Sequence, residues 1–501
     1  MSFNSLQFLI YLPIVLLVYF VLPHKVRWVW LLSASYYFYM SWNPWLVFLI
    51  LGTTIVSYLA SILIERSQSP GRRKFYLAIT IIVCLGILVF FKYFNFLVQS
   101  AIGFLNLFSL NIHSFALDLI LPIGISFYTF QTLSYVIDVY RGDYQAEHHF
   151  GYFALFVSFF PQLVAGPIER PGDLLPQLKA EHHFNSEDFL AGTKILLSGF
   201  FRKVVVADFL GLFVTTGFNN LAEANSLAVY LSCILFMIQI YCDFAGYSEI
   251  ATGSARIMGI KLTTNFDRPY LATSFSEYFR RWHITLNRWF TYYLYIPLGG
   301  NRKGKARKIL NTFIVFGLCG LWHGARWPYV LWGLYGALFV SIESLVRKPF
   351  FNYCKTHHIN LDNLGIKTFR RIYTFILLSL SAVLFRCEDF TSIGIAYSKL
   401  FTGFGGDFFL DAASLLGLTW SNCLLIILIL VSMCLIYYFA NSTPKIHTQI
   451  KEGDMTATEV KKSSYIGHEL ITIFIITATI AICWISLLSI SGESAFAYFQ
   501  F

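Results

Sequence analysis

Apolar runs about as long as a bilayer is thick recur along most of this chain, and they restrict its fold more than any other feature. A helix needs about 20 apolar residues to cross the hydrocarbon core of a membrane. The sequence therefore predicts an all-α, polytopic transmembrane protein with about 11–13 membrane segments. The runs are 6–22, 26–41, 44–64, 75–95, 117–139, 190–213, 226–248, 327–346, 372–386, 422–440 and 467–490, with 150–164 and 309–321 as shorter or broken candidates.

The composition agrees, since 56% of the 501 residues are hydrophobic and only 13% are charged, against about 25% charged in soluble domains. The sequence shows no soluble domain, low-complexity tail or internal repeat between the runs. We expect one integral-membrane domain over 1–501, with N-terminal helices in 1–116, the site-bearing core in 117–346 and C-terminal helices in 347–501. The lipid bilayer is its first predicted partner.

The net charge of +10 does not indicate a nucleic-acid partner, because the basic residues gather in short loops between apolar runs. Such loops favour the cytoplasmic side of a membrane. The basic loops are 24–27, 65–74, 301–308, 346–348 with 367–371, and 445–462. With these loops inside, both ends of the chain are predicted to lie on the extracytoplasmic side.

The stretch 249–300 departs from the apolar pattern, because it is rich in arginine, glycine and aromatic residues. Polar or irregular backbone at membrane depth survives only where other helices bury it or where it lines a cavity. We therefore expect re-entrant and amphipathic helices around a buried central site.

His323 is the first candidate for chemistry, in the sequence "GLWHGARW", directly after Trp322 and before Gly324. Segment 309–321 follows a basic loop and rises only about 20 Å, so His323 should lie within the membrane. Burial disfavours the charged imidazolium, which leaves a neutral ring able to take a proton from a hydroxyl. Gly324 would let a substrate or a second backbone come close. The alternative is a core histidine that is hydrogen-bonded between helices.

His283 is the second candidate, in "FRRWHITLNRWF", and it also follows a tryptophan, Trp282. On one continuous helix, Arg280 would lie three residues before it and Asn287 four residues after it, and both would share its face. The alternative is an interfacial helix whose arginines contact lipid phosphates.

Asp243 and Tyr247 are spaced four residues apart and would line one helix face. A buried carboxylate needs a partner, for which we expect Arg256, Arg268 or a histidine. A structural ion pair is favoured over a catalytic acid.

The remaining polar features of the sequence give weaker indications of a catalytic or binding role. The proline-rich stretch 159–178 indicates a rigid bend that shapes a cavity or a docking surface. Histidine pairs in polar loops lack further ligands, and the nine cysteines form no CxxC pair, so no metal site is predicted.

Four stretches together resemble the membrane-bound O-acyltransferase family: "FPQLVAGPIER", "IYCDFAGYSEIATGSARIMGI", "RRWHITLNRWFTYYLYIPLGGNRKG" and "LCGLWHGARWPYVLWGLYGAL". The likeness is greatest to a bacterial branch of alginate O-acetyltransferases and related polysaccharide acetylases, and it extends over 121–346. It implies a helical fold with a buried, funnel-shaped site, in which His323 is the invariant histidine and His283 the second one. Thr291 and Tyr292 stand where the family often has Arg-Asp, so we assign that pair no role.

The resemblance also implies the reaction. A cytoplasmic thioester donor, acetyl-CoA or an acyl-carrier protein, would dock near 301–308, and no cofactor would be bound. His323 would act as general base, and His283 would position the donor or stabilise the oxyanion. A periplasmic acetyl-accepting partner protein would pass the group to a polysaccharide such as alginate, which places the chain in the bacterial cytoplasmic membrane.

Two other functions stay open at this stage. D-alanyl transfer to teichoic acid belongs to a sister branch that shares both histidine motifs. A channel or transporter also fits a polar cavity in a helical bundle, although the sequence lacks the internal repeat typical of many transporters.

Overall fold

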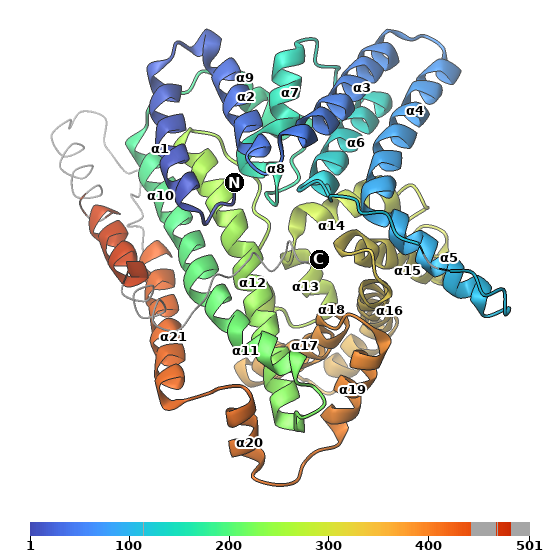
Figure 1. The fold of residues 1–501 in the computed structure, drawn as a ribbon, viewed down its shortest axis with the longest axis vertical. Coiled ribbons are helices and arrows are strands. Elements are labelled where there is room, and N and C mark those ends of the chain that lie inside the picture. Colours follow the sequence, from blue (N-terminus) through green and yellow to red (C-terminus); the bar gives the residue numbers. More distant parts are fainter. Residues whose placement is uncertain (114, 442–466, 468, 482–501) are drawn as a thin grey trace.

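The computed structural model describes residues 1–113, 115–441, 467 and 469–481 (Figure 1). Helices account for most of these residues and no strand occurs among them, which confirms the all-α prediction. The α-helices are α1 (Leu6–Val21), α2 (His24–Met40), α3 (Val47–Arg66), α4 (Pro70–Leu88), α5 (Phe94–Asn106), α6 (Ile125–Arg141), α7 (Phe150–Ser158), α8 (Phe160–Leu163), α9 (Pro171–Lys179), α10 (Ser186–Phe200), α11 (Asp208–Asn219), α12 (Ser226–Ile257), α13 (Phe275–Arg281), α14 (Ile284–Phe290), α15 (Gly304–His323), α16 (Trp327–Thr356), α17 (Leu364–Leu380), α18 (Ala382–Arg386), α19 (Phe390–Phe401), α20 (Phe408–Leu415) and α21 (Trp420–Asn441).

Tighter and wider turns interrupt or extend several of these helices. The 3₁₀ turns are η1 (Pro44–Leu46) and η4 (Pro269–Leu271), and the π-helical turns are η2 (Val89–Tyr93), η3 (Phe201–Ala207) and η5 (Thr291–Tyr295). A further apolar helix covers Glu469–Ala481. π-Helical turns often mark functional positions, and η2 lies within a long apolar helix.

Where the structure describes them, the predicted membrane segments lie mostly on helices, but fewer of them are long and apolar enough to cross a bilayer unaided. Residues 482–490 of the last predicted segment lie outside the described residues. Within the described residues, five helical stretches meet this condition, or up to six if the bent pair α20–α21 is one span. The predicted count of 11–13 included helices that are short, charged or interrupted. The five stretches are Pro44–Arg66, Pro70–Asn106, Ser226–Ile257, Trp327–Thr356 and Leu364–Arg386.

Two predicted boundaries differ from the structure for local reasons. The segment expected over 117–139 becomes helical only at Ile125, because Pro122 and the left-handed Gly124 (φ 75°) precede it. The segment expected to end at residue 248 continues to Ile257, because its small residues fit closely against α10.

The long helix α12 runs through the middle of the molecule and contacts α10, α11, α17 and α19 around it (Figure 1). Glycines make the closest of these contacts possible. A Cβ atom added to Gly246 would lie 2.7 Å from the carbonyl oxygen of Gly199, and one added to Gly253 would lie 2.7 Å from that of Gly192. The seven-residue spacing on both helices therefore brings two pairs of glycines together, as close helix packing in membranes requires.

After α12 the chain breaks into the short helices α13 and α14 and the π-helical turn η5, in the stretch where re-entrant and amphipathic helices were expected. Several side chains of α13 and α14 are buried, including Phe275, Tyr278, Leu286 and Phe290. This part of the chain is packed inside the bundle and carries His283.

The glycine contacts generate a prediction about stability. Gly246→Ala should lower the free energy of unfolding by about 1–3 kcal/mol, because the new methyl group meets backbone atoms that can move only if the helices separate. Thermal unfolding of the detergent-solubilised protein measures this effect.

Gly86→Ala in α4 is the matched control, because a Cβ atom there meets nothing within 4 Å. That change should leave stability unchanged or raise it by up to about 1 kcal/mol through helix propensity. Equal midpoints for the two variants would contradict close packing of α10 and α12.

Candidate active site

The two predicted histidines lie next to each other in the core of the bundle. The ring centroids of His283 and His323 are 6.3 Å apart, and the residues are only 1% and 7% exposed. The two residues are 40 positions apart in the sequence, and they meet because the α13–α14 turn packs against the end of α15. Two imidazoles at this separation can act on the same small group.

His323 is the last residue of α15, and aromatic rings surround it. Its ring centroid lies 5.0 Å from that of Trp322, 5.2 Å from that of Trp332 and 5.7 Å from that of Phe385. Gly324 was expected to let a substrate or a second backbone come close, but the nearest group is the ring of Tyr329, 2.3 Å from where a Cβ atom would stand. The glycine therefore serves packing between α15 and α16.

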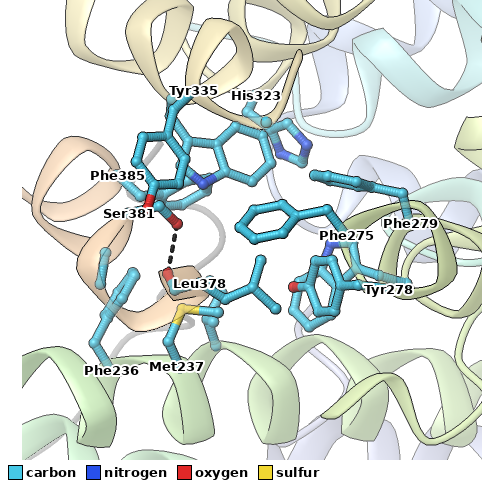
Figure 2. A pocket seen from close by; sticks show the side chains of 15 residues that line it. Phe236, Met237, Phe275, Tyr278, Phe279, His323, Tyr335, Leu378, Ser381 and Phe385 are labelled. Carbon is cyan, nitrogen blue, oxygen red and sulfur yellow. Dashed lines mark hydrogen bonds between the residues drawn. The ribbon is translucent and has the colours of Figure 1, made fainter. Parts of the chain in front are cut away.

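His323 also lines a narrow apolar cavity with a volume of about 30 Å³, shown in Figure 2. Among the described lining residues, His323 alone has a basic nitrogen, and the hydroxyl groups of Tyr335 and Ser381 donate to backbone carbonyls. Trp282 contributes to the same wall. The other lining residues are Phe236, Met237, Ile240, Phe275, Tyr278, Phe279, Trp332, Gly336, Leu378, Ala382 and Phe385.

His283 occupies the turn between α13 and α14 in a left-handed conformation, with φ 44° and ψ 56°. This backbone is strained for a residue other than glycine, by about 1–3 kcal/mol, and such strain often occurs at functional sites. Within the described part of the chain, neither ring nitrogen of His283 has a hydrogen-bond partner. Its ring lies against Phe244 (4.7 Å between centroids) and Trp322 (5.6 Å).

The prediction that Arg280, His283 and Asn287 share one helix face is wrong, because the helix is broken at His283. Arg280 is exposed, so the structure does not bring it to the site. Asn287 supports the turn instead, since its side-chain amide donates to the carbonyl oxygens of Phe279 (2.8 Å) and Trp282 (2.6 Å).

Asn265 holds the other side of this turn, and sequence reasoning missed it. Its side-chain oxygen accepts from the Thr285 hydroxyl at 2.6 Å, its backbone oxygen accepts from the Ile284 N–H at 2.9 Å, and its amide donates to the Ser248 hydroxyl at 3.0 Å. Asn265 is 2% exposed. No sequence motif singles it out, since the contacts depend on how the chain returns after α12.

Asp243 and Tyr247 lie beside the site and stabilise its surroundings. Asp243 pairs with Lys203 of η3 at 2.9 Å, not with Arg256, Arg268 or a histidine as predicted. Arg256 pairs with Asp188 at 2.6 Å. The structural role expected of Asp243 is consistent with this geometry.

The ring of Tyr247 stacks on that of Phe3 at 4.4 Å, which ties the first residues of the chain to α12. Phe244, on the same helix, contacts His283. One turn of α12 therefore joins both the N-terminal segment and the candidate site.

The proline-rich stretch 159–178 packs against the His283 turn. The Ile168 N–H donates to the Thr285 hydroxyl at 3.1 Å, and Glu169 accepts from the backbone and hydroxyl of Thr263 at 2.6 and 3.0 Å. Burial raises the pKa of Glu169 to about 7, although its bonds with Thr263 act in the opposite direction.

Lys92 is a second residue that the sequence analysis missed. Its ammonium group donates to the backbone oxygen of Trp322 at 2.6 Å, next to His323. The sequence contained a signal for it, because a lysine within the apolar run 75–95 is energetically costly and therefore indicates a function.

Thr291 and Tyr292 lie in η5, which follows the C-terminal end of α14, and Tyr292 stacks with Arg170.

Comparison with known proteins identifies relatives of this chain. The family model described as MBOAT, membrane-bound O-acyltransferase family, matches residues 145–385. A probable alginate O-acetylase of Pseudomonas putida is 33% identical, with 100% of both chains covered. A peptidoglycan O-acetyltransferase of Helicobacter pylori is 32% identical over 78% of each chain. A teichoic acid D-alanyltransferase of Bacillus subtilis is more distant, at 26% identity over 46% of this chain and 61% of its own length.

These matches confirm the resemblance inferred from the four motifs. The region matched by the family model contains both buried histidines, the turn that carries His283 and the end of α15. The relatives also remove the channel or transporter alternative, since those named here are transferases. The chain belongs to the membrane-bound O-acyltransferase family and is a multi-pass membrane O-acyltransferase.

Proposed function

We propose that this enzyme moves an acetyl group from a cytoplasmic thioester donor across the bacterial cytoplasmic membrane for O-acetylation of an extracytoplasmic polysaccharide such as alginate. The donor is acetyl-CoA or an acyl-carrier protein, and a periplasmic partner protein accepts the acetyl group before the polymer does. The names of the relatives that cover most of the chain, alginate O-acetylase and peptidoglycan O-acetyltransferase, support acetyl as the transferred group.

The observation that carries the proposal is the buried pair of histidines beside an apolar cavity. In this mechanism the hydroxyl oxygen of the acceptor attacks the thioester carbonyl carbon, and His323 takes the hydroxyl proton. The carbon–sulfur bond breaks, and the proton passes to the leaving thiolate. His283 has two ring nitrogens without a partner among the described residues, so it is suited to donate to the oxyanion or to orient the donor.

The basic loops support the proposed direction of transfer. The donor approaches the basic loop 301–308 at the cytoplasmic end of α15, and this helix leads to His323 at its other end. The N-terminus is then extracytoplasmic. The C-terminus, to which we assign the same side, lies outside the described residues.

The first prediction concerns His323. In cells that lack the native copy, His323→Ala should insert into the membrane normally but lower ester-linked acetate on the polymer by at least about 100-fold, the usual contribution of a general base. The measurement is acetate released by mild alkali, divided by the amount of inserted protein.

His183→Ala is the matched control for this experiment, because His183 is an exposed loop histidine. It should retain full acetylation. Wild-type acetate from His323→Ala would remove His323 from the chemistry and with it the proposed mechanism.

The second prediction concerns the transferred group. Esters released from polymer made by the active enzyme should contain acetate and no D-alanine, while the His323→Ala strain releases neither. Chromatography of the alkali-released acids distinguishes the two. D-Alanine that depends on His323 would assign the enzyme to the teichoic acid branch instead.

A further inference from the structure

Lys92 stands where a cation is costly. It lies in η2, inside the helical stretch Pro70–Asn106, which has a mean hydropathy of 2.5 over its most apolar window. Only 17% of that window is buried inside the protein, so most of the stretch faces outward. An ionisable side chain at such a position is retained when it does something that an apolar one cannot.

The ammonium group of Lys92 points inward and joins three elements. It donates to the backbone oxygen of Trp322 at 2.6 Å and to the hydroxyl of Ser126, at the start of α6, at 3.3 Å. It also lies 5.7 Å from the centroid of the Trp322 ring, within range of a cation–π interaction. Lys92 belongs to the π-helical turn η2, and from there its side chain reaches the end of α15.

The carbonyl that Lys92 binds belongs to the last turn of α15. The last four carbonyls of a helix have no partner within the helix, and the helix dipole makes that end negative. One of them, on Gly320, receives the N–H of Gly324 at 3.4 Å. The carbonyl of Trp322 receives the lysine, so the charge both satisfies a buried acceptor and fixes the peptide bond between Trp322 and His323.

Trp322, whose backbone Lys92 binds, also contacts both histidines with its ring. Its ring centroid is 5.0 Å from that of His323 and 5.6 Å from that of His283, and it also packs on Phe127 at 5.2 Å. A movement of the Trp322 peptide would therefore move one imidazole directly and release a neighbour of the other.

We propose that Lys92 is a positioning residue for acyl transfer, which holds the end of α15 so that His323 stays aligned with His283. This inference rests on the proposed catalytic role of His323. Lys92 acts through the backbone of Trp322 and not on the substrate. A displacement of about 1 Å at a reacting group can cost about 100-fold in rate.

The test compares Lys92→Met, which keeps the length of the side chain without its charge, with Lys92→Arg, which keeps the charge and the donors. We expect Lys92→Met to insert normally and to unfold at a lower temperature, because the buried carbonyl of Trp322 loses its donor. It should also lose about 100-fold in the initial rate of polymer acetylation per folded protein. Lys92→Arg should recover at least about a tenth of the wild-type rate, because a guanidinium group can still donate to the Trp322 carbonyl.

Lys194→Met is the control for removing a buried lysine. Lys194 pairs with Glu469, away from the histidines, and both side chains are almost fully buried. Its loss should lower the unfolding temperature, because Glu469 then lacks its partner, while the rate per folded protein stays near that of wild type.

The outcomes separate this inference from the proposed function. A wild-type rate in Lys92→Met, together with an inactive His323→Ala, would overturn the role of Lys92 alone. Equal losses in Lys92→Met and Lys92→Arg, or an equal loss of rate in Lys194→Met, would show that packing and not the charge is what matters. Full activity of His323→Ala would overturn the proposed function itself.

Discussion

Backbone polar groups that cannot reach water must be satisfied by the protein, and this constraint organises the candidate site. A left-handed turn and a helix end both leave carbonyls and N–H groups without regular partners. Side chains supply partners here, that of Asn287 at the turn of His283 and that of Lys92 at the end of α15, while the backbone oxygen of Asn265 accepts from the Ile284 N–H. The polar residues named here therefore act mainly on the backbone around the histidines.

The same constraint explains why α12 serves both the fold and the site. Its glycines allow α10 to approach, its Asp243 is neutralised by Lys203, and its Phe244 packs against the ring of His283. A buried carboxylate without a cation would destabilise this helix strongly. Substitutions in the Asp243–Lys203 ion pair should therefore lower stability first. They should affect the rate of acyl transfer only indirectly, by disturbing α12.

The sequence predicted the parts of the site that depend on composition and on short motifs. The helical class and the burial of His323 could be read from the apolar runs, and the four stretches singled out both histidines. The prediction that Arg280 and Asn287 share a helix face with His283 is wrong. It assumed a continuous helix, but His283 adopts φ 44° and breaks the helix there.

The partners of buried charged residues could not be predicted from the sequence either. Asp243 pairs with Lys203, forty residues earlier, and nothing in either local sequence selects that pair over Arg256 or Arg268. Contacts of this kind follow from how helices pack, and sequence periodicity describes only one helix at a time. Lys92 differs, because its position within an apolar run was itself a visible signal.

The lining of the cavity beside His323 bears on which acyl group is transferred. None of its described lining residues is an aspartate or a glutamate, and aromatic and aliphatic side chains form nearly all of its wall. A D-alanyl group carries an ammonium that would be buried there without a counter-ion from these described residues, and that costs several kcal/mol. An acetyl group is neutral and ends in a methyl group that such a wall accommodates. If the acyl group reaches His323 through this cavity, the electrostatics of the pocket favour acetyl over alanyl, in line with the relatives that cover most of the chain.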